Sequence, residues 1–368
     1  QNRRCLNGSD AALDTKAIRQ KRGRHRAEKI ALTSDARNTS LEDDMKRRGF
    51  IGALLSAAFW QTTAQAQERT RVATVGYVDA ASRSAGMEGL LTGLRELGYV
   101  DGKNIRLVRQ QFAAPTVEKM KEAILAVLPY VDILVVGGTV GGVAAKSATA
   151  EIPVVFISVG APVDIGLVRS LAKPGGNMTG VTFEAAEETY AKRLQLLTEV
   201  VPGLSNVAIL GAVGDPNFPF AMVSLERSAP GLKVLLTRVA VNSADDLPRA
   251  FDEMKQTRQQ ALLVVSGSLT YGSIKETADL ALVNGLPSCH GFREAVAAGG
   301  LISLGPDLVS LGRQSARLVD KIIKGERPAD IPVEQPAQYV MSMNLRTAKA
   351  LGLTVPPSLL ARADELIE

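Results

Sequence analysis

Residues 71–78 read RVATVGYV, a mostly apolar run of β-forming residues that ends before the polar Asp79. Runs that are apolar on both faces are typical of parallel strands buried between helices. The next segment ends at the helix stop Gly98 and carries an apolar stripe at helical spacing, formed by Met87, Leu90, Leu91, Leu94 and Leu97. This order of strand and helix predicts an α/β fold with a doubly wound sheet.

The alternation of strand and helix continues along the chain. Further strands are expected at 105–111, 132–137, 152–159, 206–211, 232–241, 261–266 and 286–289. Helices between them are expected at 116–128, 141–149, 187–200, 217–228, 245–257 and 271–284. Two successive blocks of this kind, each of about 110 residues, predict two doubly wound, Rossmann-like lobes.

The end of the chain is less regular and too short for a third domain. It contains an expected strand at 299–305, a helix at 308–324, a strand at 332–343 and two short helices at about 345–351 and 357–367. These elements are enough to complete two unfinished lobes, so we expect the chain to cross between the lobes near residues 183, 302 and 328. Lobe I then comprises 67–182 plus 303–327, and lobe II comprises 183–302 plus 328–368. Three crossings form a hinge, and a hinge between two lobes implies a cleft.

The positive charge of the protein belongs to the front of the chain. The formal net charge is +5, but residues 67–368 carry 30 basic and 31 acidic residues, because 13 of the 43 basic and seven of the 38 acidic residues precede them. The body therefore has no electrostatic basis for binding nucleic acid. Apolar residues make up 46% of the chain, which supports a sizeable core and excludes wholesale disorder.

Residues 45–66 have the pattern of an export signal peptide. Three basic residues at 46–48 precede the apolar run FIGALLSAAFW at 50–60, and Ala64-Gln65-Ala66 forms a small-x-small cleavage site. Eleven apolar residues span only about 16 Å as a helix, which is too short to cross a bilayer. The paired arginines also fit a twin-arginine signal, so we expect export to the periplasm by the Sec or the twin-arginine route. Residues 1–44 lack apolar periodicity, and we expect them to be a disordered extension ahead of the true start at Met45.

The body has few residues suited to catalysis. Cys289 and His290 are its sole Cys and His, which excludes an internal disulfide and a tetrahedral His/Cys zinc site. Adjacent strand residues point to opposite faces, so these two side chains should not meet, and Cys289 is expected to be an inert buried thiol. We expect no enzyme activity, no cofactor and no metal. An enzyme that uses the Gly-rich loop at 137–142 is an alternative, although this loop lacks the G-x-G-x-x-G spacing.

Candidate ligand-binding residues lie after the strands, because ligands of open α/β sheets bind at the carboxyl ends of the strands. The backbone at Gly138 with the hydroxyls of Thr139 and Ser158 can bind a carboxylate. The full set of candidates is Tyr77, Asp79, Ser82, Gly138, Thr139, Ser158, Gly160, Asp215, Asn217, Ser266, Arg293, Glu294 and Asp307.

Three acidic candidates could pair with a ligand ammonium group, namely Asp215, Glu294 and Asp307. Each polar candidate also has a purely structural interpretation. Thr139 could simply cap a helix, Asp215 could belong to a turn with Pro216, and Arg293 with Glu294 could form a structural ion pair. These alternatives stay open at the level of the sequence.

Several stretches together carry a specific resemblance. Residues 166–180 read GLVRSLAKPGGNMTG, and the others are 45–51 (MKRRGFI), 93–104 (GLRELGYVDGKN), 144–149 (AAKSAT), 152–156 (IPVVF), 291–294 (GFRE), 299–300 (GG), 332–336 (PVEQP) and 348–353 (AKALGL). The chain from Met45 to Glu368 resembles the substrate-binding proteins of ABC transporters, specifically the family whose characterised members bind aromatic amino acids. The resemblance implies the type I periplasmic binding fold and the capture of a small ligand for uptake. It also implies an ABC permease in the inner membrane, with its ATPase, as partner of a monomeric chain.

The sequence departs from the family at positions that affect the ligand. Family members often carry Tyr where Leu304 stands and Asp where Ala161 stands. The body has no Trp and few other aromatic residues, with Tyr77, Phe218 and Tyr271 as candidate walls for a ring. We therefore expect an amino acid or a related carboxylate, with a small or aliphatic amino acid as an option.

A ligand-sensing receptor or regulator core of the same fold is a second alternative. Regulators of this fold carry a helix-turn-helix module before the first lobe. Residues 1–44 contain no paired apolar helices, and the export signal follows them. No nucleic-acid partner is therefore expected.

Overall fold

The computed structural model describes residues 72–79, 85–111, 116–184 and 188–368. Residues 71–368 form a compact unit of their own. The expected extension at 1–44, the expected export signal at 45–66 and the candidate Ser82 lie outside the described residues. Within the described ranges, no helix has both the length and the hydrophobicity needed to cross a membrane.

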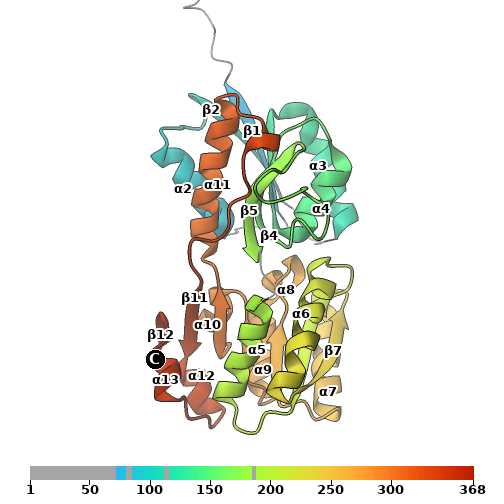
Figure 1. Cartoon of the computed structure of the whole chain (residues 1–368), viewed down its shortest axis with the longest axis vertical. Helices are drawn as coiled ribbons and strands as arrows, with labels where there is room; N and C mark the ends of the chain where they lie inside the picture. Colours follow the sequence, from blue (N-terminus) through green and yellow to red (C-terminus); the bar gives the residue numbers. More distant parts are fainter. Residues whose placement is uncertain (1–71, 80–84, 112–115, 185–187) are drawn as a thin grey trace, which may run out of the picture. The chain divides into compact units, whose positions relative to one another are not determined.

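The first sheet has five parallel strands in the order β2-β1-β3-β4-β5. They are β1 (Ala73–Asp79), β2 (Ile105–Gln111), β3 (Ile133–Gly137), β4 (Val154–Gly160) and β5 (Met178–Glu184). Four helices cover its two faces (Figure 1). Helices α2 (Ala85–Glu96) and α11 (Leu308–Ile323) pack on one face, and α3 (Val117–Val127) and α4 (Gly138–Ala148) pack on the other.

The second sheet has seven strands in the order β12-β11-β10-β9-β8-β6-β7. They are β6 (Asn206–Ala212), β7 (Leu235–Val241), β8 (Ala261–Val264), β9 (Ser288–His290), β10 (Ile302–Gly305), β11 (Val340–Asn344) and β12 (Glu365–Ile367). All neighbouring pairs are parallel except β10 with β11, which is antiparallel. Helices α5 (Glu188–Val200) and α6 (Asn217–Leu232) pack on one face, and α7 (Leu247–Gln256) and α9 (Ile274–Val283) on the other. The shorter helices are α8 (Ser268–Gly272), α10 (Arg293–Ala297), α12 (Leu345–Ala350) and α13 (Pro357–Leu360).

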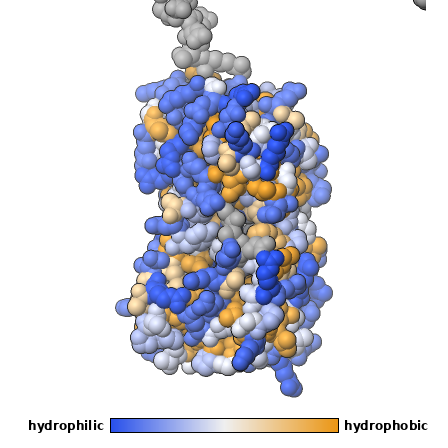
Figure 2. Space-filling model, viewed as in Figure 1, coloured by the Kyte–Doolittle hydropathy of each residue, from blue (hydrophilic) through white to orange (hydrophobic). Residues whose placement is uncertain are grey.

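Central strands such as β3 are apolar throughout because both of their faces are buried. In β3, Ile133 and Val135 belong to the core beneath α2 and α11, whereas Leu134 and Val136 belong to the core beneath α3 and α4. Successive side chains of a strand point to opposite faces, so a strand between two helix layers must be apolar at every position. The surface is different, because hydrophilic residues cover most of the face seen in Figure 2 and apolar residues form small groups among them.

The predicted α/β architecture with two doubly wound sheets is confirmed, and a few elements differ from the prediction. The helix expected at 271–284 is divided at Ser273 into α8 and α9. The helix expected at 357–367 ends at Leu360, and Glu365–Ile367 form β12, because their backbone pairs with β11. The short helix α10 was not predicted, since five residues carry too little periodicity to be recognised.

The expected crossing points need correction. Residues 303–305 do not join the first sheet, because β10 pairs with β9 and β11. Helix α11, which follows, does pack on the first sheet against α2. Residues 331–334 also stay with the first sheet, where the Glu334 backbone pairs with β5, and the chain joins the second sheet only at β11. A buried strand has the same apolar pattern in either sheet, so the sequence could not assign these segments.

Candidate ligand-binding site

A cavity lies where the carboxyl ends of the two sheets face each other. The strands β1, β3, β4 and β5 reach it from the first sheet, and the segments after β6, β8 and β9 reach it from the second. The cavity has a volume of about 70 Å³, several times what a single buried water requires. The ends of parallel strands are the expected place for a ligand site in such sheets.

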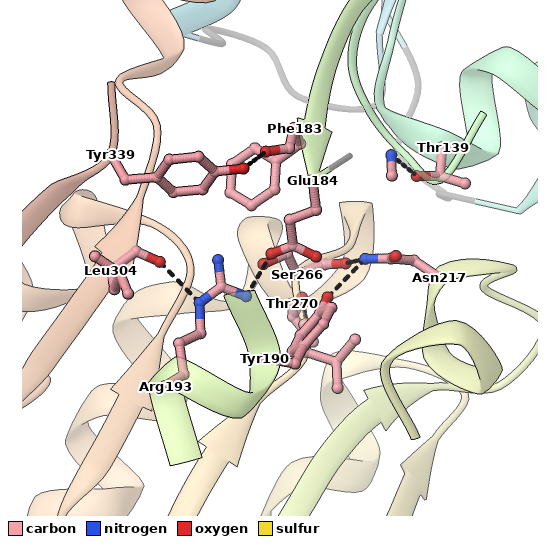
Figure 3. Close-up of polar contacts among 12 residues, drawn as sticks. Thr139, Phe183, Glu184, Tyr190, Arg193, Asn217, Ser266, Thr270, Leu304 and Tyr339 are labelled. Atoms are coloured by element: carbon pink, nitrogen blue, oxygen red, sulfur yellow. Dashed lines mark hydrogen bonds and ion pairs between the residues drawn. The ribbon is translucent and has the colours of Figure 1, made fainter. Parts of the chain in front are cut away.

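The turn from β3 into α4 forms one polar wall. Gly138 adopts a φ of 71° at the start of the helix, which a side chain would strain. The backbone N–H of Gly160 donates a 3.0 Å hydrogen bond to Oγ1 of Thr139, which joins this turn to the end of β4 (Figure 3). The N-cap of α4 is Gly137, so Thr139 does not cap the helix. The free N–H groups of the first turn remain available to an anion.

Ser158 lies in an irregular part of β4 and lines the cavity. The pairing of β4 with β5 shifts register on either side of Val159, and Ser158 has a φ of 64°. Left-handed backbone is uncommon outside glycine and is strained, and bulges often direct a side chain toward a site. The irregularity therefore presents Ser158 to the cavity at some cost in backbone energy.

Asp79 is the sole carboxylate among the described residues that line the cavity. The Tyr77 hydroxyl donates a 2.8 Å hydrogen bond to its Oδ2. A Cβ atom at Gly137 would stand 2.6 Å from the same carboxylate. A larger residue at position 137 would therefore clash with the Asp79 side chain. The described lining of the cavity thus offers one carboxylate for a cationic part of a ligand.

Two polar side chains from the second sheet complete the wall. Nδ2 of Asn217 donates to the Tyr190 hydroxyl at 2.8 Å and to the carbonyl oxygen of Ser266 at 2.7 Å. Oδ1 of Asn217 and Oγ of Ser266 are buried and have no hydrogen-bond partner among the described residues. Both residues line the cavity, where Oδ1 of Asn217 lies next to Gly160 and Oγ of Ser266 lies next to Gly291.

The apolar part of the cavity is aromatic. The rings of Phe183 and Phe292 are 5.0 Å apart between centroids, and Tyr271 packs edge-on against Phe292 at 4.8 Å. These three residues line the cavity together with Tyr77. The sequence analysis did not identify Phe183 and Phe292 as site residues. Phe183 lies near the end of β5 and Phe292 shortly after β9. The strand-end rule, which was applied to polar residues, could have found both if it had also been applied to aromatic ones. Phe218, an expected wall, lies instead in the core beneath Gly211.

The remaining candidates do not line this cavity. Asp215 accepts a 2.9 Å hydrogen bond from the backbone N–H of Asn217 and a further one from that of Ser268, and burial raises its pKa to about 6. Arg293 lies 3.2 Å from both Asp307 and Glu365, and Asp307 also accepts from the N–H of Ser310.

Glu294 is absent from the cavity lining as well, and burial raises its pKa. None of Asp215, Glu294 and Asp307 lines this cavity, and the expectation that one of them meets a ligand stays a prediction. Asp215 and Asp307 are already committed to hydrogen bonds with helix termini.

A buried ion pair that the sequence did not suggest lies next to the cavity (Figure 3). Glu184 ends β5, Arg193 lies on α5, and both side chains are fully buried. Nε of Arg193 donates a 2.7 Å hydrogen bond to the carbonyl oxygen of Leu304 in β10. Burial lowers the pKa of Arg193, but the combined effect of Glu184, Tyr190 and Cys289 is larger and raises this pKa above its usual value. A buried charge of this kind needs its partner.

Cys289 and His290 have no features of a catalytic pair. Cys289 lies in the core, and burial raises the pKa of its thiol to about 12. Burial lowers the pKa of His290 to about 3, and its Nε2 lies 3.0 Å from Oγ of Ser288. A reactive thiol needs a lowered pKa and access to solvent. In the part of the chain that the structure describes, no three His, Cys, Asp or Glu residues are grouped to hold a metal ion.

Comparison with known proteins places the chain among binding proteins. The model of the family described as ABC transporter substrate binding protein matches residues 71–367. The chain belongs to this family. Membership confirms the resemblance found in the sequence and implies a small-molecule ligand and a transporter partner.

Individual relatives agree with the family. The chain is 25% identical over 278 residues to the tyrosine-binding protein of Clostridioides difficile (strain R20291), covering 75% of this chain and 79% of that protein. A conserved domain protein from Vibrio cholerae superposes with a TM-score of 0.74 at 26% identity, over 80% of this chain and all of that one. An ABC domain in complex with L-Trp from Streptococcus pneumonia superposes with a TM-score of 0.75 at 23% identity, over 80% of this chain and 99% of that one.

The fold also occurs in a regulator. The Lac repressor bound to ONPG superposes with a TM-score of 0.53 at 15% identity, over 83% of this chain and 90% of that one. This likeness concerns the fold alone. The relatives that match the family are substrate-binding proteins and not enzymes.

Proposed function

We propose that this substrate-binding protein captures an aromatic amino acid in the cavity between the two sheets and delivers it to an ABC permease and its ATPase. The observation that carries the proposal is the composition of the cavity. Aromatic side chains, one carboxylate and the free N–H groups of a helix start line the same space. An aromatic amino acid presents the matching set of a ring, an ammonium group and a carboxylate.

The ring would pack among Phe183, Tyr271 and Phe292. Aromatic pairs are stabilised by offset or edge-to-face contacts, and the edge-on contact of Tyr271 with Phe292 already has this geometry. A small aliphatic amino acid would leave these rings without contacts. The ligands named for two related proteins, tyrosine and L-Trp, support the same class.

The charged end of the ligand would lie at the first sheet. The start of α4 and the Ser158 hydroxyl offer donors to the carboxylate, and Asp79 offers an acceptor to the ammonium group. Because the cavity has walls from both sheets, a bound ligand would bridge them. A ligand that contacts both halves favours the closed arrangement to the extent that it binds this arrangement more tightly than an open one. We also propose the two-lobe hinge and a periplasmic setting after export, in keeping with the family.

Calorimetric titration and thermal unfolding against a panel of ligands test the proposal. The panel comprises L-Tyr, L-Trp, L-Phe, L-Leu, L-Ala and 3-(4-hydroxyphenyl)propionate, which lacks the ammonium group. We expect an aromatic amino acid to bind most tightly and to raise the free energy of unfolding by about 2.7 kcal/mol at 100 times its Kd.

A pair of variants checks the location of the site. Phe292→Ala should weaken binding of the aromatic ligand about 10-fold or more, because it removes the central ring of the wall. Tyr130→Ala, at an exposed tyrosine outside the cavity, should leave binding unchanged. Preference for L-Leu or L-Ala over all aromatic members, or no binding of any amino acid, would refute the proposal.

A further inference from the structure

A row of buried polar side chains leads from the cavity to the ion pair. Asn217 lines the cavity, Tyr190 contacts Asn217, Glu184 lies beside Tyr190, and Arg193 pairs with Glu184 (Figure 3). Asn217 is 3% exposed and the other three are fully buried. Burying so many polar groups is costly unless each has a partner. Glu184 and Arg193 have each other as an ion pair, whereas Oδ1 of Asn217 has no hydrogen-bond partner among the described residues.

The contacts of Asn217 determine which way its amide faces. The carbonyl oxygen of Ser266 can only accept a hydrogen bond, so the amide group that faces it at 2.7 Å must be the NH₂. The second hydrogen of the same NH₂ is donated to the Tyr190 hydroxyl. Both hydrogens are therefore committed, and Oδ1, which lies next to the cavity-lining residue Gly160, is left as an acceptor.

Tyr190 accepts from Asn217, so its own hydroxyl proton must be directed elsewhere. The Glu184 carboxylate lies beside this hydroxyl, and burial together with Glu184 raises the pKa of Tyr190 well above its usual value. Arg193 in turn balances the charge of Glu184 and is held to β10 through Leu304. The ion pair thus keeps the oxygen of Tyr190 available as an acceptor for Asn217.

Asn217 meets the polar end of the cavity. A Cβ atom at Gly160 would stand 2.5 Å from Oδ1 of Asn217, and Gly160 is the residue that hydrogen-bonds Thr139 at the start of α4. Figure 3 places Asn217 on the side of Thr139 and away from Phe183. The free oxygen therefore lies where the charged end of the ligand is expected.

We infer that Oδ1 of Asn217 is a fixed hydrogen-bond acceptor that selects ligands with an ammonium group, and that Tyr190, backed by the Glu184–Arg193 pair, is the positioning residue that holds it in place. The inference rests on the proposed function, because it takes the ligand to be an amino acid. An ammonium group has three donors, so it can satisfy Asn217 as well as Asp79.

The test compares L-Tyr, or whichever aromatic amino acid binds best, with its analogue lacking the ammonium group. Calorimetric affinities are measured for the full chain, for Tyr190→Phe, for Asn217→Ala and for the double variant. Asn217→Ala should weaken the amino acid about 10- to 100-fold, as is typical for a hydrogen bond to a charged group, and Tyr190→Phe about 5- to 10-fold. The analogue should change less than about 2-fold in every variant, since it does not use this acceptor.

The double variant separates positioning from simple destabilisation. If Tyr190 acts through Asn217, adding Tyr190→Phe to Asn217→Ala should cause no further loss. Tyr99→Phe is the matched control, because it removes a hydroxyl that bonds Asp320 away from the cavity. Circular dichroism and thermal unfolding check that each variant is folded.

The outcomes are distinguishable. Equal losses for the amino acid and its analogue, additive losses in the double variant, or losses confined to ligands with a phenol hydroxyl would overturn the inference while the proposed function stands. Failure of the unaltered chain to bind any amino acid would overturn both.

Discussion

Ser158 illustrates how a single residue is held in an unfavourable backbone conformation at the site. Its φ of 64° falls in the left-handed region, and it lies in the irregular part of β4. Such residues carry a strain of about 1–3 kcal/mol and persist where the surroundings impose the conformation. The proposed role of its hydroxyl in binding a ligand carboxylate gives that strain a function.

Replacing Ser158 separates strain from binding. Ser158→Gly should raise the free energy of unfolding by about 1 kcal/mol, because glycine adopts this φ without strain. Ser158→Ala should not be stabilised, since it keeps the strain. Both variants lose the hydroxyl and should weaken the ligand to a similar degree. Chemical denaturation and calorimetry measure the two effects, and equal stability of the two variants would show that Ser158 is unstrained.

The raised pKa of Asp215 predicts that the free energy of unfolding depends on pH. Burial raises its pKa from 3.8 to about 6, despite hydrogen bonds from the Asn217 and Ser268 backbones that lower it. Between pH 3.8 and about 6, Asp215 is therefore protonated in the folded state and ionised in the unfolded state. The contribution of Asp215 to the free energy of unfolding is fully present below pH 3.8 and is lost as the pH rises to about 6. At about 1.4 kcal/mol per pKa unit the loss is on the order of 3 kcal/mol.

Asp215→Asn should remove this contribution. Its free energy of unfolding should change less between pH 4 and pH 7 than that of the unaltered chain, by about 2–3 kcal/mol. Asp252→Asn, at an exposed aspartate of α7, is the control and should keep the original pH profile. Urea unfolding at several pH values measures the difference, and identical profiles for Asp215→Asn and the unaltered chain would contradict the assignment.

At the level of elements, α2 and α11 come unusually close. A Cβ atom at Gly312 would stand 2.1 Å from the carbonyl oxygen of Gly86, and one at Gly89 would stand 2.0 Å from that of Val309. Backbone atoms cannot yield as a flexible side chain can. Glycine at these two positions therefore lets the helices pack backbone against backbone, although they are more than 200 residues apart in sequence.

Gly312→Ala should force the two helices apart. We expect a loss of about 1–3 kcal/mol in the free energy of unfolding, as for other overpacked cores. Gly231→Ala, also within a helix but with nothing within 4 Å of the added methyl, should instead be neutral or stabilising by up to about 1 kcal/mol. Thermal and chemical unfolding compare the pair, and a neutral Gly312→Ala would show that the helices can separate freely.

At the level of residues 71–368 as a whole, the proposed closure depends on contacts between the two sheets. Gly160 ends a strand of the first sheet, and Asn217 begins a helix on the second. A methyl group at Gly160 would stand 2.5 Å from Oδ1 of Asn217. The described arrangement thus has no room for a side chain at this position.

Gly160→Ala should therefore hinder closure around a ligand. We expect affinity for the amino acid to fall about 10-fold or more, and the ligand-induced compaction seen by solution scattering to be lost, because overpacking disfavours only the closed arrangement. Gly176→Ala, where nothing lies within 4 Å, should retain both. Normal compaction and affinity in Gly160→Ala would argue against closure by approach of these two residues.

Much of the fold could be read from local patterns. Apolar runs such as 133–137 predicted buried parallel strands, because a strand covered on both faces must be apolar throughout. The strand-end rule also found residues that the structure brings to one cavity, namely Tyr77, Asp79, Gly138, Thr139, Ser158, Gly160, Asn217 and Ser266. Their role in binding a ligand stays a proposal.

Other features depended on contacts between segments far apart in sequence. The pairing of β10 with the second sheet, the convergence of Phe183 with Phe292, and the Glu184–Arg193 pair each join positions that local patterns do not relate. The scarcity of aromatic residues in the body argued for a smaller ligand. Four of them, Tyr77, Phe183, Tyr271 and Phe292, nevertheless line one cavity, which a count cannot reveal.

The amino-acid sequence by itself determined the α/β class, the family and the edge of each sheet at which a site would form, since backbone periodicity and strand polarity are local properties. Only the tertiary structure decided which strand belongs to which sheet, which carboxylate faces the cavity and which way the Asn217 amide points. Those outcomes depend on the partners that folding brings within hydrogen-bond and van der Waals distance, and the partners come from the whole chain.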